Sequence, residues 1–143
     1  MKKLNNKGFS LVELLTTMTI LGILMAVAVA SVFVYLDNSR KQAMDTIAST
    51  SYDGMVNYMM ENNILLNPKG EANSTATVQI KDLYEENYIE KPIDPYNDGG
   101  MCEGTVTVRN ETTSSTTGLE DYRYEVHVEC SGDHVLDVSY PKN

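Results

Sequence analysis

The chain has 143 residues and no tryptophan, and its 11 basic residues against 20 acidic ones give a formal net charge of −9. This length allows one small domain with an appendage rather than two independent cores. A phosphate-binding face needs clustered lysine and arginine, but outside the N-terminus only Arg40 and Lys41 adjoin. We therefore expect no direct nucleic-acid binding.

Charge is distributed unevenly along the chain. Lys2, Lys3 and Lys7 precede a long apolar run, which leaves eight basic residues against the 20 acidic ones. This asymmetry follows the positive-inside rule. It predicts a cytoplasmic N-terminus, a membrane crossing and an exported acidic remainder.

The apolar run from Leu14 to Leu36 has 23 residues with no charge and no proline. At 1.5 Å per residue, this is enough to cross a bilayer core of about 30 Å. Two other interpretations of this run are a plain signal anchor and a cleaved signal peptide. The second is suggested by Ala28-Val29-Ala30, which offers a small-residue cleavage site. Neither needs Glu13 at the head of the run, where a carboxylate in hydrocarbon costs about 2.5 to 3.5 kcal/mol.

The stretch from Lys7 to Glu13, KGFSLVE, resembles the prepilin motif of type IV pilins and type II secretion pseudopilins. In that family a short basic leader ends in glycine before an aromatic residue. The resemblance implies that a membrane aspartyl protease cuts between Gly8 and Phe9 and methylates the new N-terminus. Residues 1–8 are then the leader peptide, and Phe9 is the N-methylated first residue.

The same resemblance explains Glu13. With the leader removed, Phe9 has a free amine one helical turn from Glu13, and a neighbouring subunit displaced along a filament can bring its own Phe9 to that carboxylate. A buried ion pair of this kind fixes register more than it adds stability. Glu13 is therefore predicted to be an assembly contact.

After Leu36 the chain turns polar, but the helical period continues. An apolar stripe at spacings of three and four residues comprises Met44, Ala48, Tyr52, Met55 and Met59. We expect one helix over residues 9–62, whose part 9–36 serves the membrane and assembly. Asn67-Pro68-Lys69-Gly70 then breaks the helix, and residues 63–143 form a globular C-terminal domain.

The C-terminal domain is predicted to be an antiparallel sheet that packs on this helix, a pilin-like α+β fold. Alternating runs predict three strands, over Thr105–Arg109, Tyr122–Glu129 and His134–Tyr140. Before them, Glu71–Thr77 is predicted to be a loop and Val78–Ile89 a short helix.

The two cysteines lie at the ends of a predicted hairpin. Cys102 precedes the first strand and Cys130 ends the second, so antiparallel pairing brings them together. In an oxidising compartment this favours a disulfide, with two buried thiols as the alternative.

Other candidate sites are weak. The loop from Asp94 to Gly100 has some carboxylates and glycines of a calcium loop, but Tyr96 and Thr105 occupy ligand positions of the EF-hand pattern. We expect a polar turn and no metal. His127 and His134 lie on predicted strands without a nucleophile at useful spacing, so no catalytic residue and no cofactor are predicted.

The sequence thus predicts a non-enzymatic subunit of a type IV pilus-like filament: a surface pilus, a competence filament or a secretion pseudopilus. Its expected partners are other pilin subunits, the prepilin peptidase, an assembly platform and the membrane. It is expected to be a single-pass membrane protein before assembly and part of an extracytoplasmic filament afterwards. The alternative is an anchored surface binding module that does not polymerise, with the loop from Asn110 to Gly118 as its recognition surface.

Overall fold

The structure is a computed structural model that describes residues 9–67, 69–112 and 121–141. The chain divides into two units, residues 1–39 (unit 1) and residues 40–143 (unit 2). Helix α1, Leu11–Glu61, supplies the helical residues of unit 1 and continues into unit 2 without interruption.

The part of α1 in unit 2 carries the apolar stripe that the sequence predicts. Its buried members are Met44, Ala48, Met55 and Met59, with Tyr52 half-buried beside them. Ser51 is also buried, and its hydroxyl donates to the carbonyl of Ile47 at 2.7 Å. The stripe prediction is confirmed, and its one buried hydroxyl is satisfied within the helix.

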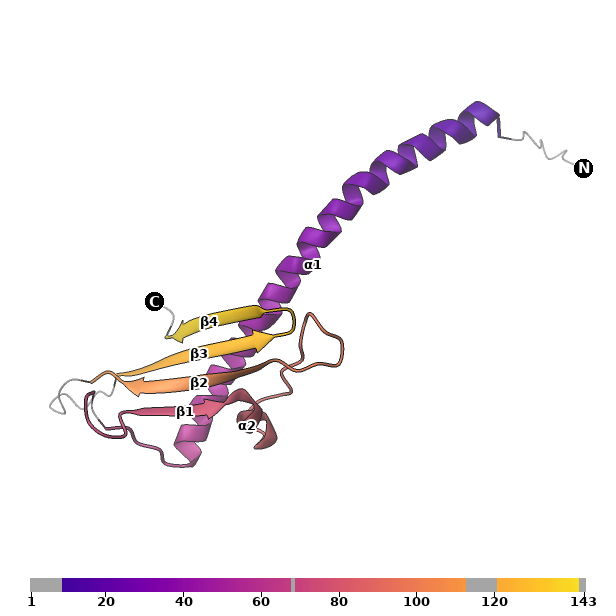
Figure 1. The fold of residues 1–143 in the computed structure, drawn as a ribbon. Coiled ribbons are helices and arrows are strands. Elements are labelled where there is room, and N and C mark those ends of the chain that lie inside the picture. The colour runs from indigo at the N-terminus through magenta and orange to yellow at the C-terminus, as the bar shows by residue number, and fades with distance from the viewer. Residues whose placement is uncertain (1–8, 68, 113–120, 142–143) are drawn as a thin grey trace, which may run out of the picture. The chain divides into compact units, whose positions relative to one another are not determined.

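Four antiparallel strands form one sheet in the order β1-β2-β3-β4 (Figure 1). The elements are β1, Thr75–Gln79; α2, Ile80–Glu85; β2, Glu103–Asn110; β3, Tyr122–Cys130; and β4, His134–Tyr140. Within unit 2, α1 runs across one face of this sheet (Figure 1). The predicted α+β, pilin-like arrangement is confirmed.

The prediction of three strands is wrong, because a fourth strand lies where the sequence predicts the end of a loop and the start of a helix. β1 pairs with β2 from Thr75 opposite Arg109 to Gln79 opposite Thr105, and α2 then covers only half of the helix predicted over 78–89. Half-buried Ala76 and Val78 alternate with exposed Thr75, Thr77 and Gln79, so the period of two is present. The residues of β1 are small or polar, so the sequence gives little signal for a strand. Pairing with β2, which is distant in sequence, determines its conformation.

The core lies between α1 and the inner face of the sheet. Its buried residues from the sheet and α2 include Val106, Val108, Val126, Val128, Ile80 and Leu83. The Tyr52 ring of α1 meets the Tyr124 ring edge-on at 5.0 Å and stacks on the Tyr140 ring at 4.7 Å. Since burying one such apolar side chain contributes about 1.5 to 3 kcal/mol, this single layer of contacts stabilises the domain.

Cys102 and Cys130 form a disulfide, with their Cα atoms 4.4 Å apart and a separation of 28 positions in sequence. It joins the segment before β2 to the end of β3, at the place where the predicted hairpin puts the two cysteines. A closed loop of this length stabilises a domain by about 3 to 4 kcal/mol on the chain-entropy model.

Gly54 provides a stability test, because α1 and the segment after α2 approach closely there. A Cβ at position 54 would overlap Cγ2 of Ile89 and lie 3.3 Å from the Tyr88 carbonyl oxygen. Alanine favours a helix by about 1 kcal/mol over glycine, but overpacking costs about 1 to 3 kcal/mol. We expect Gly54→Ala to lower the free energy of unfolding by up to about 2 kcal/mol in urea titrations of the full chain in detergent.

The matched control is Gly22→Ala, also in α1, where a Cβ would have nothing within 4 Å. We expect it to leave the urea midpoint of unit 2 unchanged. A Gly54→Ala protein more stable than wild type, by the about 1 kcal/mol that alanine gains in a helix, would contradict the close approach.

Candidate assembly site

The start of α1 is capped by Ser10. The Ser10 carbonyl accepts the first helical hydrogen bond, from the Leu14 N–H at 3.1 Å, and its hydroxyl oxygen accepts the Glu13 N–H at 3.2 Å. Ser10 is thus the N-cap, and Glu13 occupies the third helical position, as in a capping box. A carboxylate in the first turn is also favoured by the helix dipole.

This geometry places Phe9 just before the helix. α1 begins at Leu11, so Phe9 and Glu13 do not share a helical face here, although their spacing suggests it. Phe9 is 79% exposed, and Glu13 is exposed as well. Phe9 itself therefore lies outside the helix, and Gly8 lies outside the described residues.

Ser10 is a capping residue that was not predicted from the sequence. The signal was present as Ser10 followed three residues later by Glu13, at the head of an apolar run. Phe9 and Leu14 also stand at the two positions of a hydrophobic staple. The same residues that match a cleavage motif therefore start the helix.

The apolar part of α1 satisfies its own hydroxyl groups. All four serine and threonine hydroxyls between residues 14 and 36 donate to helix carbonyls three or four residues earlier, at 2.8 to 3.2 Å; they belong to Thr16, Thr17, Thr19 and Ser31. Such bonds remove the cost of placing a hydroxyl in hydrocarbon. This leaves Glu13 as the strongly polar side chain of the segment 9–36.

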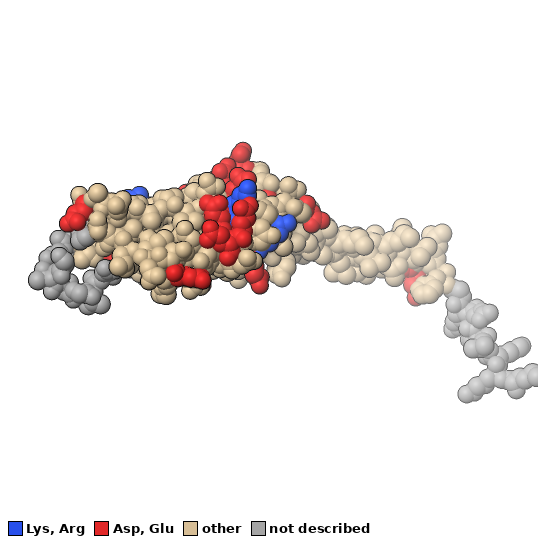
Figure 2. Space-filling view, turned by 90° about the horizontal axis from the view of Figure 1, so that it is seen from below, with Lys and Arg blue, Asp and Glu red and all other residues tan. Residues whose placement is uncertain are grey.

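The same segment exposes its apolar surface all round. Every large apolar side chain from Phe9 to Leu36 is at least 42% exposed. Among the described residues, α1 is the one helix long and apolar enough to cross a membrane. In the space-filling view, the helix outside unit 2 is almost entirely uncharged (Figure 2).

Residues 3–29 match the model of the prokaryotic N-terminal methylation motif. The chain carries a type IV pilin-class prepilin signal. The matched range includes Gly8, Phe9 and Glu13 and extends into the apolar part of α1. Comparison with curated proteins and with solved structures finds no match. The prepilin signal together with the apolar helix fits a membrane-anchored precursor.

The loop considered for calcium has a different role for its first carboxylate. Asp94 is buried, and its two carboxylate oxygens accept the N–H of Tyr96 at 2.8 Å and of Ser131 at 2.9 Å. The sulfurs of Cys102 and Cys130 lie within 4.8 Å of it, but they are bonded to each other and offer no thiolate. Asp94 thus ties this loop to the β3–β4 turn beside the disulfide.

The histidines are engaged in packing and pairing on unit 2. His127 Nδ1 lies 2.6 Å from Asp137 Oδ1 across β3 and β4, on the exposed face of the sheet. The His134 ring stacks on the Tyr96 ring at 3.5 Å, and the Arg40 guanidinium lies 5.5 Å from the centre of the same Tyr96 ring.

The loop proposed as an alternative recognition surface is described only at its start. Asn110 is buried, and its side-chain amide donates to the Leu66 carbonyl at 3.0 Å, so it serves the core. Residues 113–120 lie outside the described ranges.

The buried carboxylate of Asp94 should make the free energy of unfolding depend on pH. Burial by itself raises the pKa of Asp94, but hydrogen bonds from Ser131, Tyr96 and Asn97 outweigh it and hold the pKa below the ordinary value of 3.8. A depressed pKa contributes stability above about pH 4, and this contribution is lost as the pH falls through the folded-state pKa. We expect Asp94→Asn to cost about 1.5 to 3 kcal/mol at pH 7 in urea unfolding, and less below pH 4.

Asp98→Asn is the matched control, because Asp98 is an exposed carboxylate of the same loop. We expect its stability to follow that of the wild type from pH 3 to pH 7. A difference between Asp94→Asn and wild type that stays constant with pH would rule out the charge as the cause.

Proposed function

We propose that this chain is a structural subunit of a type IV pilus-like filament. It would be made as a membrane-anchored precursor, processed by a prepilin peptidase and assembled through the first part of α1. The proposal rests on one observation, which is that the methylation motif overlaps the exposed apolar part of α1. The methylation motif, matched at residues 3–29, ends within a helix that exposes apolar side chains all round and begins with one carboxylate.

In this proposal residues 1–8 are the leader, residues 9–62 the assembly helix and residues 63–143 the globular domain. The peptidase cuts between Gly8 and Phe9 and methylates Phe9. The lack of helical structure at Phe9 supports this, because a protease needs its substrate backbone extended and accessible.

Glu13 supplies the contact between subunits. Apolar side chains around the whole circumference of a helix are stabilised as well by lipid as by a neighbouring helix. They therefore do not fix the axial position of one helix relative to another. A carboxylate that meets the Phe9 ammonium of an adjacent copy selects one register, because any other leaves two charges unpaired in an apolar environment. The work of the chain is then mechanical, and none of its residues is catalytic.

The expected partners follow from this mechanism: further pilin subunits, the prepilin peptidase, the assembly platform and the membrane. Before assembly the chain spans the cell membrane once, with its N-terminus in the cytoplasm. After assembly its acidic globular domain lies outside the cell. A surface pilus, a DNA-uptake fibre and a secretion pseudopilus would all use these steps.

Mass spectrometry of the N-terminus tests the processing step. We expect the mature protein to begin at Phe9 with one added methyl group, and Gly8→Val to leave the precursor uncut and out of filaments. Gly22→Val, at a glycine of α1 where a Cβ would meet nothing within 4 Å, is the control and should be processed normally. A mature chain that keeps Met1, or one that starts after Ala30, would refute the proposal.

Glu13→Gln tests the assembly step with a side chain of nearly the same shape. We expect normal processing and membrane insertion but at least a roughly tenfold loss of the protein from sheared filaments, because a missing buried ion-pair partner costs about 3 to 5 kcal/mol. Immunoblots of filament and membrane fractions measure the ratio.

Asp53→Asn is the control for Glu13→Gln, since Asp53 is an exposed carboxylate further along α1. It should enter filaments at the wild-type level. Wild-type incorporation of Glu13→Gln would exclude the ion pair as the contact that fixes register.

A further inference from the structure

Exposed apolar side chains on unit 2 gather at its two opposite ends. Among the described residues outside 9–36, the large apolar side chains with high exposure are Met60 at 72%, Leu65 at 78%, Ile93 at 61% and Val135 at 49%. Met60 lies in the last turn of α1, and Leu65 follows that turn. Ile93 and Val135 lie in two segments close to the disulfide. The sides of the domain carry none of them.

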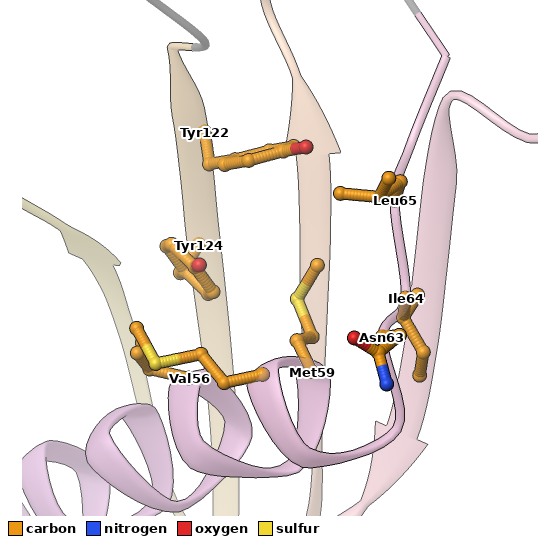
Figure 3. Close-up of a pocket in the computed structure, with 8 residues that line it drawn as sticks. Val56, Met59, Asn63, Ile64, Leu65, Tyr122 and Tyr124 are labelled. Atoms are coloured by element: carbon orange, nitrogen blue, oxygen red, sulfur yellow. The ribbon is translucent and has the colours of Figure 1, made fainter.

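The first pair lies at what we call the distal end of unit 2, where α1 ends. A pocket of about 260 Å³ opens there, lined by side chains from the last turns of α1, the loop after it and the start of β3. The lining residues are Val56, Met59, Met60, Asn63, Ile64, Leu65, Tyr122 and Tyr124. Figure 3 shows the rings of Tyr122 and Tyr124 and the side chains of Met59 and Leu65 around one shared space.

The second pair lies at the other end, which we call the proximal end, near Arg40. Ile93 precedes Asp94, whose carboxylate binds the Ser131 N–H in the β3–β4 turn, and Val135 follows that turn. The Tyr96–His134 stack and the Arg40 guanidinium above Tyr96 fix this end to the start of α1 in unit 2. Along α1, Arg40 and Glu61 are roughly 30 Å apart at 1.5 Å per residue.

We propose that globular domains of successive copies associate end to end, with Val135 and Ile93 of one copy seated in the distal pocket of the next. The partner is a second copy of this chain, so this inference rests on the proposed filament function. Two different patches on one molecule form a heterologous contact, which repeats without closing when the rotation does not complete a ring. This is the geometry that a filament needs.

The size of the patches favours a tethered copy over a free partner. Stable interfaces between free proteins bury about 1,200 to 2,000 Å², far more than two side chains and a small pocket supply. The pocket is also smaller than the roughly 300 to 1,000 Å³ of small-molecule sites. A copy already held by its helix has a high effective concentration, so a weak contact suffices.

Charge disfavours contact between the sides of identical copies. Acidic side chains gather on the side of unit 2 shown in Figure 2, between its two ends, and the chain has a net charge of −9. Like charges brought face to face repel one another, which disfavours contact through this side.

Disulfide crosslinking in filaments tests the contact. We expect Leu65→Cys combined with Val135→Cys to give a ladder of reducible multimers from sheared filaments on a non-reducing gel. Each single variant should give no ladder. The matched control pair is Leu65→Cys with Thr77→Cys, because Thr77 is exposed in the middle of edge strand β1, and it should give none.

Several results would overturn the inference. Filaments that contain the double variant without a ladder, or with the same ladder in the control pair, would exclude the contact. Equal crosslinking of dispersed protein in detergent would indicate a soluble dimer instead, and mixed adducts with another protein would indicate a different occupant. Absence of the wild-type chain from sheared filaments would refute the proposed function itself, which separates the two failures.

Charge substitutions give a second readout that does not depend on new cysteines. We expect Leu65→Lys and Val135→Asp each to lower filament yield about tenfold, which corresponds to roughly 1.4 kcal/mol, and the double variant to recover most of it. Urea midpoints of both proteins in detergent should match wild type. Wild-type yield in both single variants would contradict the contact.

Discussion

One continuous helix that serves two environments is the constraint on which this structure depends. The backbone hydrogen bonds of α1 run from Leu11 to Glu61, but the distribution of apolar side chains changes along it. Up to Leu36 they are exposed all round, whereas from Met44 a single stripe is buried. An α-helix suits both parts because it satisfies its backbone internally, in hydrocarbon as in a protein core.

The polar groups of the first part are arranged around the same constraint. Ser10 takes up an N–H of the first turn, and the threonine and serine hydroxyls donate to helix carbonyls, so little polarity remains to resist an apolar environment. Glu13 is the exception. In the proposed filament, that exception makes one register of neighbouring subunits better than all others.

The second part of α1 forms one side of a thin core. One helix against one sheet gives a single contact layer, and the domain adds covalent and electrostatic ties at one end. The Cys102–Cys130 disulfide and the Asp94–Ser131 hydrogen bond hold the segment before β2 to the β3–β4 turn. The opposite end carries the apolar pocket, and its ties are the Asn110–Leu66 hydrogen bond and the Lys69–Glu111 ion pair.

The sequence by itself determined the local features: the prepilin motif, the apolar run, the methionine stripe and three of the four strands. These depend on spacing and on nearest neighbours, which are readable along the chain. It did not reveal β1, because a short run of small and polar residues becomes a strand only when β2 offers its edge. Only the tertiary structure decided that Asp94 is buried beside the disulfide and that four exposed apolar side chains lie at opposite ends of unit 2. Both features depend on contacts between segments that are far apart in sequence.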